Sequence, residues 1–132
     1  MSDALLAAAR EAMARAYCPY SNFHVGAAIE TDDGVVFAGC NVENASFGGT
    51  ICAERSAVVS AVSAGRRRFR RIVVVSDAAQ PVAPCGLCRQ FLAEFGLDLE
   101  VHLVGSSGET KTWTLAALLP SAFTGADFQE NA

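Results

Sequence analysis

The sequence predicts an α/β fold in which helices cover a mixed sheet of about five strands. Two observations carry this prediction. First, the spacing of apolar residues switches between the helical period and the alternation of strands, in the order helix, two strands, then helices and strands by turns. Second, 52% of the 132 residues are hydrophobic, which is enough for one hydrophobic core. We therefore expect a single domain over residues 1–132.

The first expected elements are a helix and a hairpin. An amphipathic helix is expected to start at a cap on Asp3 and to end before Pro19. Its apolar residues recur at helical spacing at Leu5, Leu6, Ala9, Met13 and Ala16. The alternation within residues 25–29 and 35–40 predicts two strands, because the Asp-Asp-Gly sequence at residues 32–34 favours a tight turn between them.

Helices and strands are then expected to follow one another. A helix capped by Thr50 should run to Gly65, and a helix that begins at Pro84 should stop at Gly96. The other segments predict strands at residues 72–76, 99–104 and 110–113 and a short helix at residues 115–119.

The spacing of the cysteines predicts a metal site. Glu54 follows Cys52 by two residues, and a Pro-Cys-Gly-Leu-Cys run supplies Cys85 and Cys88. A structural zinc is normally closed by four protein ligands, whereas a catalytic zinc keeps one position for a water that it acidifies. Three thiolates therefore predict a catalytic Zn²⁺ site, with Glu54 beside it as proton shuttle. Both segments lie at expected helix starts, where the helix dipole stabilises thiolates.

Charge balance at such a site singles out Arg55. Three thiolates around one Zn²⁺ leave an excess negative charge, which weakens the metal as a Lewis acid. A guanidinium that is hydrogen-bonded to the sulfurs withdraws part of that charge. Arg55 directly follows Glu54 and is the first candidate; Arg89, next to Cys88, is the second. The alternative for each is an ordinary surface arginine.

Charge and cysteine content argue against other classes of function. The net charge of −4 argues against a nucleic-acid partner, and the arginine-rich run at residues 66–71 is expected to be solvated or to contact another subunit.

Charges interrupt the Ala-rich residues 1–16, so we expect no signal peptide, no membrane span and a cytoplasmic protein. Reduced thiols are expected, with Cys18 and Cys40 as ordinary buried residues.

The chain resembles the small, homotetrameric zinc cytidine deaminases of pyrimidine salvage. The resemblance rests on sequence blocks in the family's order: CPYSNFHVGAA (18–28), GCNVENAS (39–46), CAER (52–55), PCGLCRQ (84–90) and LLPSAF (118–123). It implies a three-layer α/β/α cytidine-deaminase-like fold and hydrolysis of free cytidine and 2′-deoxycytidine to uridine and 2′-deoxyuridine plus ammonia. In that reaction zinc-activated hydroxide attacks the base, with Cys52, Cys85 and Cys88 as zinc ligands and Glu54 as the proton shuttle.

The resemblance also implies roles for further residues. Asn41 and Glu43 match the pair that hydrogen-bonds the ribose hydroxyls, and Phe23 matches the aromatic residue that packs against the pyrimidine. Ala53 would offer backbone contacts to the base, and Phe123 would enter a neighbouring subunit's pocket in a homotetramer with shared active sites. From the residues alone, a local turn at Asn41 and Glu43 and plain core packing of both phenylalanines stay open.

The segment Phe-Gly-Gly at residues 47–49 departs from the family pattern. Many relatives have a tyrosine here and a larger residue in place of one glycine, so the range of nucleosides is left open. One alternative is therefore a deaminase of a modified nucleoside or of a nucleoside antibiotic such as blasticidin S. A remote alternative is a structural-zinc, RNA-binding module in which His24 or His102 closes the site. A thiol oxidoreductase would leave Cys52 and Glu54 unexplained.

Overall fold

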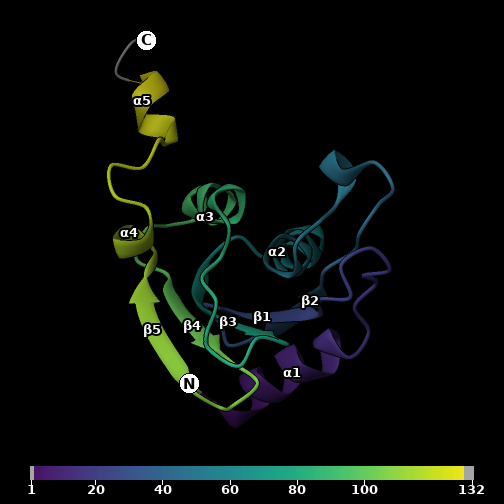
Figure 1. Cartoon of the computed structure of the whole chain (residues 1–132). Helices are drawn as coiled ribbons and strands as arrows, with labels where there is room; N and C mark the ends of the chain where they lie inside the picture. Colours follow the sequence, from purple (N-terminus) through teal and green to yellow (C-terminus); the bar gives the residue numbers. More distant parts are fainter. Residues whose placement is uncertain (1, 130–132) are drawn as a thin grey trace.

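The structure of the chain, a computed structural model, describes residues 2–129 and shows three layers (Figure 1). The middle layer is a five-stranded sheet. One face is covered by α1 (Asp3–Met13), and the other by α2 (Ala53–Ser63) and α3 (Gly86–Ala93). This arrangement confirms the predicted α/β fold with helices on both faces of a mixed sheet.

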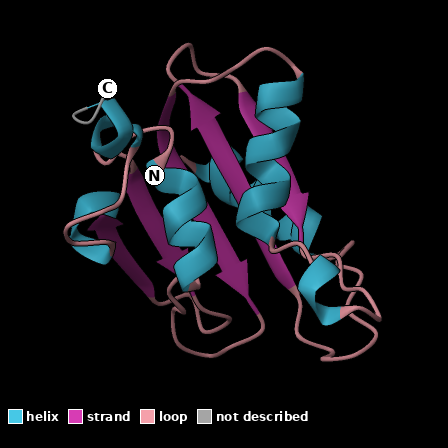
Figure 2. Ribbon diagram, turned by 90° about the horizontal axis from the view of Figure 1, so that it is seen from above, coloured by secondary structure: helices cyan, strands magenta, loops and turns pink. Residues whose placement is uncertain are grey.

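The sheet has the strand order β2-β1-β3-β4-β5. Its strands are β1 (Val25–Thr31), β2 (Val36–Cys40), β3 (Phe69–Ser76), β4 (Glu100–Val104) and β5 (Thr110–Thr114). The pair β3–β4 is parallel and is connected through α3, whereas the other neighbouring strands are antiparallel. Figure 2 shows the strands side by side with the helices crossing them. A 3₁₀ turn at Phe47–Gly49 and two short helices, α4 (Leu115–Leu118) and α5 (Gly125–Gln129), complete the described elements.

The alternation of the central strands divides the core between the two faces of the sheet. In β1, Ala27 and Ile29 pack toward α2 and α3, while Ala28 packs toward α1. In β3, Val74 likewise packs toward α2 and α3, and Val73 packs toward α1. Because neighbouring side chains of a strand point to opposite faces, one apolar run can supply both halves of the core.

Two glycines set how closely the helices approach the hairpin. A Cβ atom added to Gly39 of β2 would lie 2.5 Å from the backbone nitrogen of Ala57 in α2. A Cβ atom added to Gly26 of β1 would lie 2.1 Å from the carbonyl oxygen of Ala9 in α1. Glycine is therefore required where α1 and α2 lie directly on the sheet.

The helix starts differ from the predicted ones. The N-cap of α1 is Ser2, not Asp3, and its hydroxyl oxygen accepts a hydrogen bond from the backbone of Leu5 at 3.2 Å. The N-cap of α2 is Cys52, not Thr50, whose hydroxyl oxygen instead accepts a hydrogen bond from the backbone of Asn44. Likewise α3 begins after Cys85 rather than at Pro84. Both sulfur-bearing N-caps lack a side-chain capping bond, which leaves their thiols free to face each other.

The arginine-rich run at residues 66–71 lies partly within β3, which begins three residues earlier than predicted, at Phe69. Arg66 forms an ion pair with Asp33 at 3.2 Å, and Arg71 forms one with Glu30 at 3.3 Å. These contacts tie Arg66 and Arg71 to the hairpin, while Arg67, Arg68 and Arg70 are exposed, as expected for a solvated run. A contact of the run with another subunit stays a prediction. Over residues 2–129, moreover, the structure has no helix with the length and apolar character needed to cross a bilayer.

Candidate active site

The three predicted zinc ligands meet between α2 and α3. Cys52 and Cys85 are the N-cap residues of the two helices, and Cys88 lies in the first turn of α3. Their sulfur atoms all lie within 4.8 Å of one another, with 3.9 Å between Cys52 Sγ and Cys85 Sγ. Sulfurs bound to one tetrahedral Zn²⁺ are about 3.8 Å apart, because each Zn–S bond measures about 2.3 Å. The cysteine cluster therefore fits a zinc ion.

The thiols of the cysteine cluster differ in acidity. The hydrogen bond with Cys88, together with those from Arg55 and Cys85, lowers the pKa of Cys52 to about 5. The contact with Cys52 and burial raise the pKa of Cys88. Cys52 therefore becomes a thiolate first, and a second negative charge beside it is disfavoured without a cation. A divalent cation would satisfy that need, because thiolates bind metals whereas thiols do not.

Arg55 lies against the cysteine cluster, whereas Arg89 does not. The Arg55 Nη2 atom is 3.8 Å from Cys52 Sγ and 3.1 Å from the carbonyl oxygen of Thr50. Arg89 instead donates hydrogen bonds of 2.8 Å to the carbonyl oxygens of Pro84 and Leu118. Its guanidinium thus ties the start of α3 to α4, so Arg55 is the arginine placed to offset thiolate charge.

Glu54 is buried in the first turn of α2, with 5% of its surface exposed. Burial raises the pKa of this carboxyl to about 7. The side chain lines a cavity of about 300 Å³ that also reaches Cys52 and Cys85. The Glu54 side chain and two of the three cysteines therefore line the same small space.

The same cavity contains most of the predicted substrate-binding residues. It lies where β1 begins, where β2 and β3 end, and where α2 begins. Its lining includes Phe23, Asn41, Glu43 and Ala53. Such a volume suits a small-molecule ligand. Sequence reasoning missed other lining residues, among them Ser21, Thr50, Val82 and Ala83.

The Asn41 side chain joins two strands instead of making a local turn. Its Oδ1 atom accepts a hydrogen bond of 2.9 Å from the backbone of Val25, and its Nδ2 atom donates one of 2.8 Å to the carbonyl oxygen of Phe23. The residue is 8% exposed. Asn41 therefore fixes the start of β1, and one amide hydrogen and one lone pair remain for a ligand.

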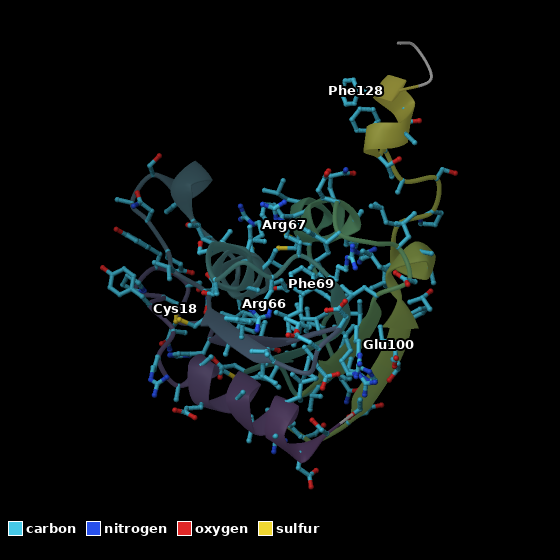
Figure 3. The ribbon with its side chains drawn as sticks, turned by 180° about the vertical axis from the view of Figure 1, so that it is seen from behind. Cys18, Arg66, Arg67, Phe69, Glu100 and Phe128 are labelled. Atoms are coloured by element: carbon cyan, nitrogen blue, oxygen red, sulfur yellow. The ribbon has the colours of Figure 1, made fainter. Side chains whose placement is uncertain are left out.

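Phe123 does not line the cavity of its own chain. It lies between α4 and α5, is 57% exposed and packs edge-on against Phe128 with ring centres 5.3 Å apart. Figures 1 and 3 show α5 standing apart from the three layers, with Phe128 labelled in Figure 3. The placement of Phe123 in a neighbouring subunit's pocket stays a prediction.

Comparison with known proteins identifies the family. Residues 1–103 match the family model of the cytidine and deoxycytidylate deaminase zinc-binding region. A cytidine deaminase from Sporosarcina psychrophila is 45% identical over 126 residues, which are 95% of this chain and 93% of that protein. The chain belongs to the cytidine deaminase family. The crystal structure of cytidine deaminase from Burkholderia pseudomallei matches with a TM-score of 0.90 and 51% identity, over 93% of this chain and 100% of that chain. The crystal structure of cytidine deaminase from Mycobacterium tuberculosis matches with a TM-score of 0.80 and 41% identity, over 93% of this chain and 98% of that chain.

Membership in the cytidine deaminase family confirms the predicted enzyme class, and the family's zinc-binding region agrees with the cysteine cluster. The alternative of a structural zinc site would need His24 or His102 as a fourth ligand. His24 pairs with Asp77 at 2.7 Å, and His102 of β4 contacts Glu100 at 3.2 Å and Thr112 of β5 at 3.1 Å. Within residues 2–129, neither histidine joins the cluster of three cysteines.

Proposed function

We propose that the chain hydrolyses the 4-amino group of free cytidine and 2′-deoxycytidine, giving uridine and 2′-deoxyuridine plus ammonia. One observation carries the proposal: the thiols of Cys52 and Cys85 and the buried carboxyl of Glu54 line the same cavity as Phe23, Asn41 and Glu43. A group that activates water and a group that moves protons thus share a small space with aromatic and polar side chains suited to a nucleoside.

In the proposed reaction Cys52, Cys85 and Cys88 hold Zn²⁺. When bound, this ion supplies Lewis acidity and acidifies a water molecule. Glu54 accepts one proton from the attacking water and delivers it to ring N3. It then accepts the second proton from the new hydroxyl on C4 and delivers it to the amino group, whose bond to C4 breaks, so that one water is consumed and one ammonia released. Arg55 donates to the Cys52 sulfur and thereby offsets the thiolate charge.

The substrate contacts of the proposal follow the cavity wall. The Glu43 carboxylate accepts hydrogen bonds from the pentose hydroxyls, and Asn41 contributes its remaining amide hydrogen. The Phe23 ring packs against the pyrimidine, and the Ala53 backbone contacts the base. Among the described residues, no lysine or arginine lines this cavity, so its chemistry suits a nucleoside without phosphate better than a polynucleotide.

The proposal also includes the assembly and setting of the enzyme. Residues 1–132 form one domain of a homotetramer in which Phe123 of one subunit completes the active site of another. The exposure of Phe123 and Phe128 supports such an interface, because large exposed apolar groups mark contact surfaces. The proposed setting is cytoplasmic pyrimidine salvage.

A substrate comparison tests the proposed function. Zinc-loaded protein is incubated with cytidine, 2′-deoxycytidine, blasticidin S and a cytidine-containing RNA oligonucleotide, and loss of the amino group is followed by ultraviolet absorbance and mass. We expect rapid conversion of both free nucleosides and none of the oligonucleotide. Conversion of blasticidin S alone would overturn the proposal and favour an antibiotic deaminase. Conversion of the oligonucleotide alone would favour a polynucleotide enzyme.

A further inference from the structure

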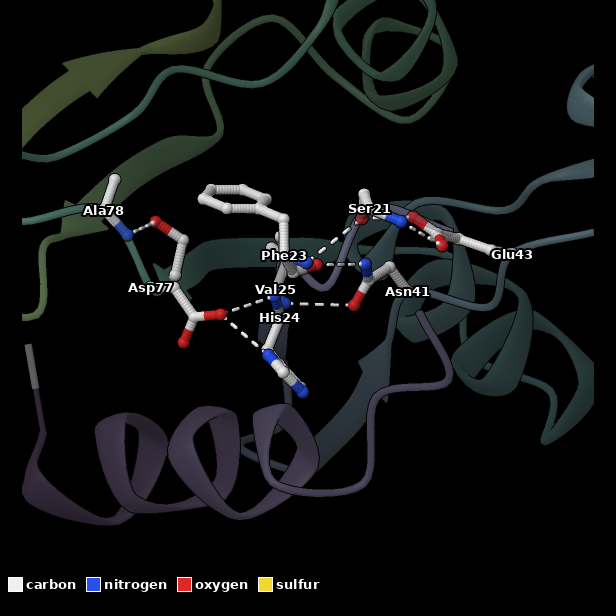
Figure 4. Close-up of polar contacts among 9 residues, drawn as sticks. Ser21, Phe23, His24, Val25, Asn41, Glu43, Asp77 and Ala78 are labelled. Carbon is white, nitrogen blue, oxygen red and sulfur yellow. Dashed lines mark hydrogen bonds and ion pairs between the residues drawn. The ribbon is translucent and has the colours of Figure 1, made fainter. Parts of the chain in front are cut away.

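The hydroxyl of Ser21 lies between two residues of the cavity wall (Figure 4). It donates a hydrogen bond of 2.5 Å to Glu43 Oε2 and accepts one of 3.0 Å from the backbone N–H of Phe23. Ser21 precedes β1 and Glu43 follows β2, so residues 22 positions apart meet here. One hydroxyl group thus touches both the carboxylate and the aromatic residue of the cavity.

Three donors hold the Glu43 carboxylate. Its Oε1 atom accepts hydrogen bonds from the backbone of Tyr20 at 2.9 Å and of Ser21 at 3.1 Å, while its Oε2 atom accepts from the Ser21 hydroxyl. The Ser21 hydroxyl is also the main cause of the lowered pKa of Glu43, with smaller help from the two backbone groups. Glu43 therefore stays an ionised acceptor in a fixed orientation.

The Ser21 hydroxyl is the anchor on one of the two carboxylate oxygens. Without it, the backbone donors would still hold Oε1, but the carboxylate plane would be free to turn about that oxygen. The cavity lining, as far as residues 2–129 form it, has no lysine or arginine to take over this task. Phe23 keeps a separate anchor, because Asn41 also holds its carbonyl oxygen at 2.8 Å. Loss of the Ser21 hydroxyl therefore affects Glu43 more than Phe23.

We propose that Ser21 is a positioning residue that sets the orientation in which Glu43 receives the pentose hydroxyls of the substrate. This inference rests on the proposed function, since it assigns Glu43 to the sugar. Ser21 acts through Glu43 on substrate binding and leaves the transfer of protons at the base to Glu54. Its effect should therefore depend on the hydroxyls of the sugar.

The test compares Ser21→Ala with the unaltered enzyme on cytidine and on 2′,3′-dideoxycytidine, which lacks the pentose hydroxyls at issue. Loss of one charge-assisted hydrogen bond should raise KM for cytidine about tenfold and change kcat by less than about threefold. On 2′,3′-dideoxycytidine the two enzymes should agree within about twofold, because there is no 2′- or 3′-hydroxyl for Glu43 to bind. Ser63→Ala, at an exposed position at the end of α2, is the control and should match the unaltered enzyme.

A double-mutant cycle locates the effect. In the Glu43→Gln background, Ser21→Ala should cost about twofold at most, because the carboxylate that Ser21 orients is gone. An equal loss on both substrates, or a full tenfold loss in the Glu43→Gln background, would overturn the positioning role. Should Ser21→Ala not fold, Ser21→Cys keeps the shape with a weaker donor and must show the same selective loss on cytidine.

Binding of the product separates this inference from the proposed function. Uridine carries the same pentose, and calorimetry can compare its affinity for the unaltered protein and for Ser21→Ala without any turnover. We expect Ser21→Ala to weaken uridine about tenfold and 2′,3′-dideoxyuridine hardly at all. If cytidine is not converted but uridine shows this difference, the proposed reaction fails and the role of Ser21 stands. If cytidine is converted and uridine shows no difference, the role of Ser21 fails alone.

Discussion

At the residue scale, the candidate metal site depends on a few side chains whose positions follow from short sequence spacings. Cys85 and Cys88 lie three residues apart at one helix start, and Cys52 and Glu54 lie two residues apart at another. The spacing of three places Cys85 and Cys88 on one side of a first helical turn, while Cys52, at the N-cap of α2, and Glu54 both line the cavity. The Arg55 guanidinium then reaches back to Cys52 Sγ at 3.8 Å within the same turn.

Replacing Arg55 should weaken zinc binding. Arg55→Gln removes the cation beside the thiolates, so we expect zinc affinity or kcat/KM to fall by roughly tenfold, as for other groups that support metal ligands. Metal competition with a chelator measures the affinity. Arg67→Gln, at an exposed arginine outside the cavity, is the matched control and should leave both quantities unchanged. Unchanged zinc retention and activity in Arg55→Gln would mean that another group balances the charge.

The spacing of residues predicted the cysteine cluster and Glu54, but it gave no sign of Ser21. Ser21 and Glu43 meet only because β1 and β2 pair antiparallel and bring the loop before one strand to the loop after the other. The same pairing lets Asn41 bridge Phe23 and Val25. Contacts of this kind need the register of the hairpin, which a pattern of apolar residues does not supply.

At the scale of elements, the approach of α2 to β2 decides where the site lies. Periodicity predicted the main helices and the strands of the sheet, because each buries one face at a regular interval. It placed the helix caps less well. Ser2 and Asp3 are both residue types that cap helices, and the structure uses Ser2 where Asp3 was predicted. It also missed α5 (Gly125–Gln129), whose short sequence buries no regular face.

A methyl group at Gly39 should separate α2 from the hairpin. The added Cβ would lie 2.5 Å from the backbone nitrogen of Ala57, and backbone cannot rotate away as a side chain does. We expect Gly39→Ala to lower the free energy of unfolding by about 3 kcal/mol, at the upper end for overpacked sites. Urea denaturation measures this loss.

The matched control for Gly39→Ala is Gly48→Ala. A Cβ at Gly48 would meet no atom within 4 Å, so the free energy of unfolding should change by less than about 0.5 kcal/mol. Equal stability of the two variants would contradict the close packing of α2 on β2. If the folded fraction of Gly39→Ala also loses cytidine turnover, the displacement of α2 has shifted Cys52 and Glu54 at its start.

At the scale of the whole molecule, one chain contains the cavity, and the segment of residues 119–129 extends away from the three layers. α5 stands apart from the sheet, and Phe123 and Phe128 pack on each other with much of their surface exposed. Gln90 of α3 donates a hydrogen bond of 2.8 Å to the carbonyl oxygen of Phe123, which fixes where the segment leaves the body. These features favour contact with another subunit.

Assembly should depend on this segment. We expect the unaltered protein to sediment as a tetramer and Phe123→Ala to shift toward smaller species with a raised KM for cytidine, because a large apolar contact is lost. Analytical ultracentrifugation over a range of concentrations measures both proteins. A monomer at high concentration in the unaltered protein would contradict the proposed homotetramer and the sharing of active sites.

In the proposed reaction, three thiolates and Glu54 together make this cavity a site of hydrolytic deamination. The decisive experiment measures turnover of cytidine by Glu54→Gln, with zinc content determined on the same sample. We predict that the variant keeps zinc, since Glu54 is not a ligand, and loses at least roughly 10²- to 10⁴-fold in kcat, since it is the group that moves protons. Turnover close to that of the unaltered enzyme at equal zinc content would contradict the claim.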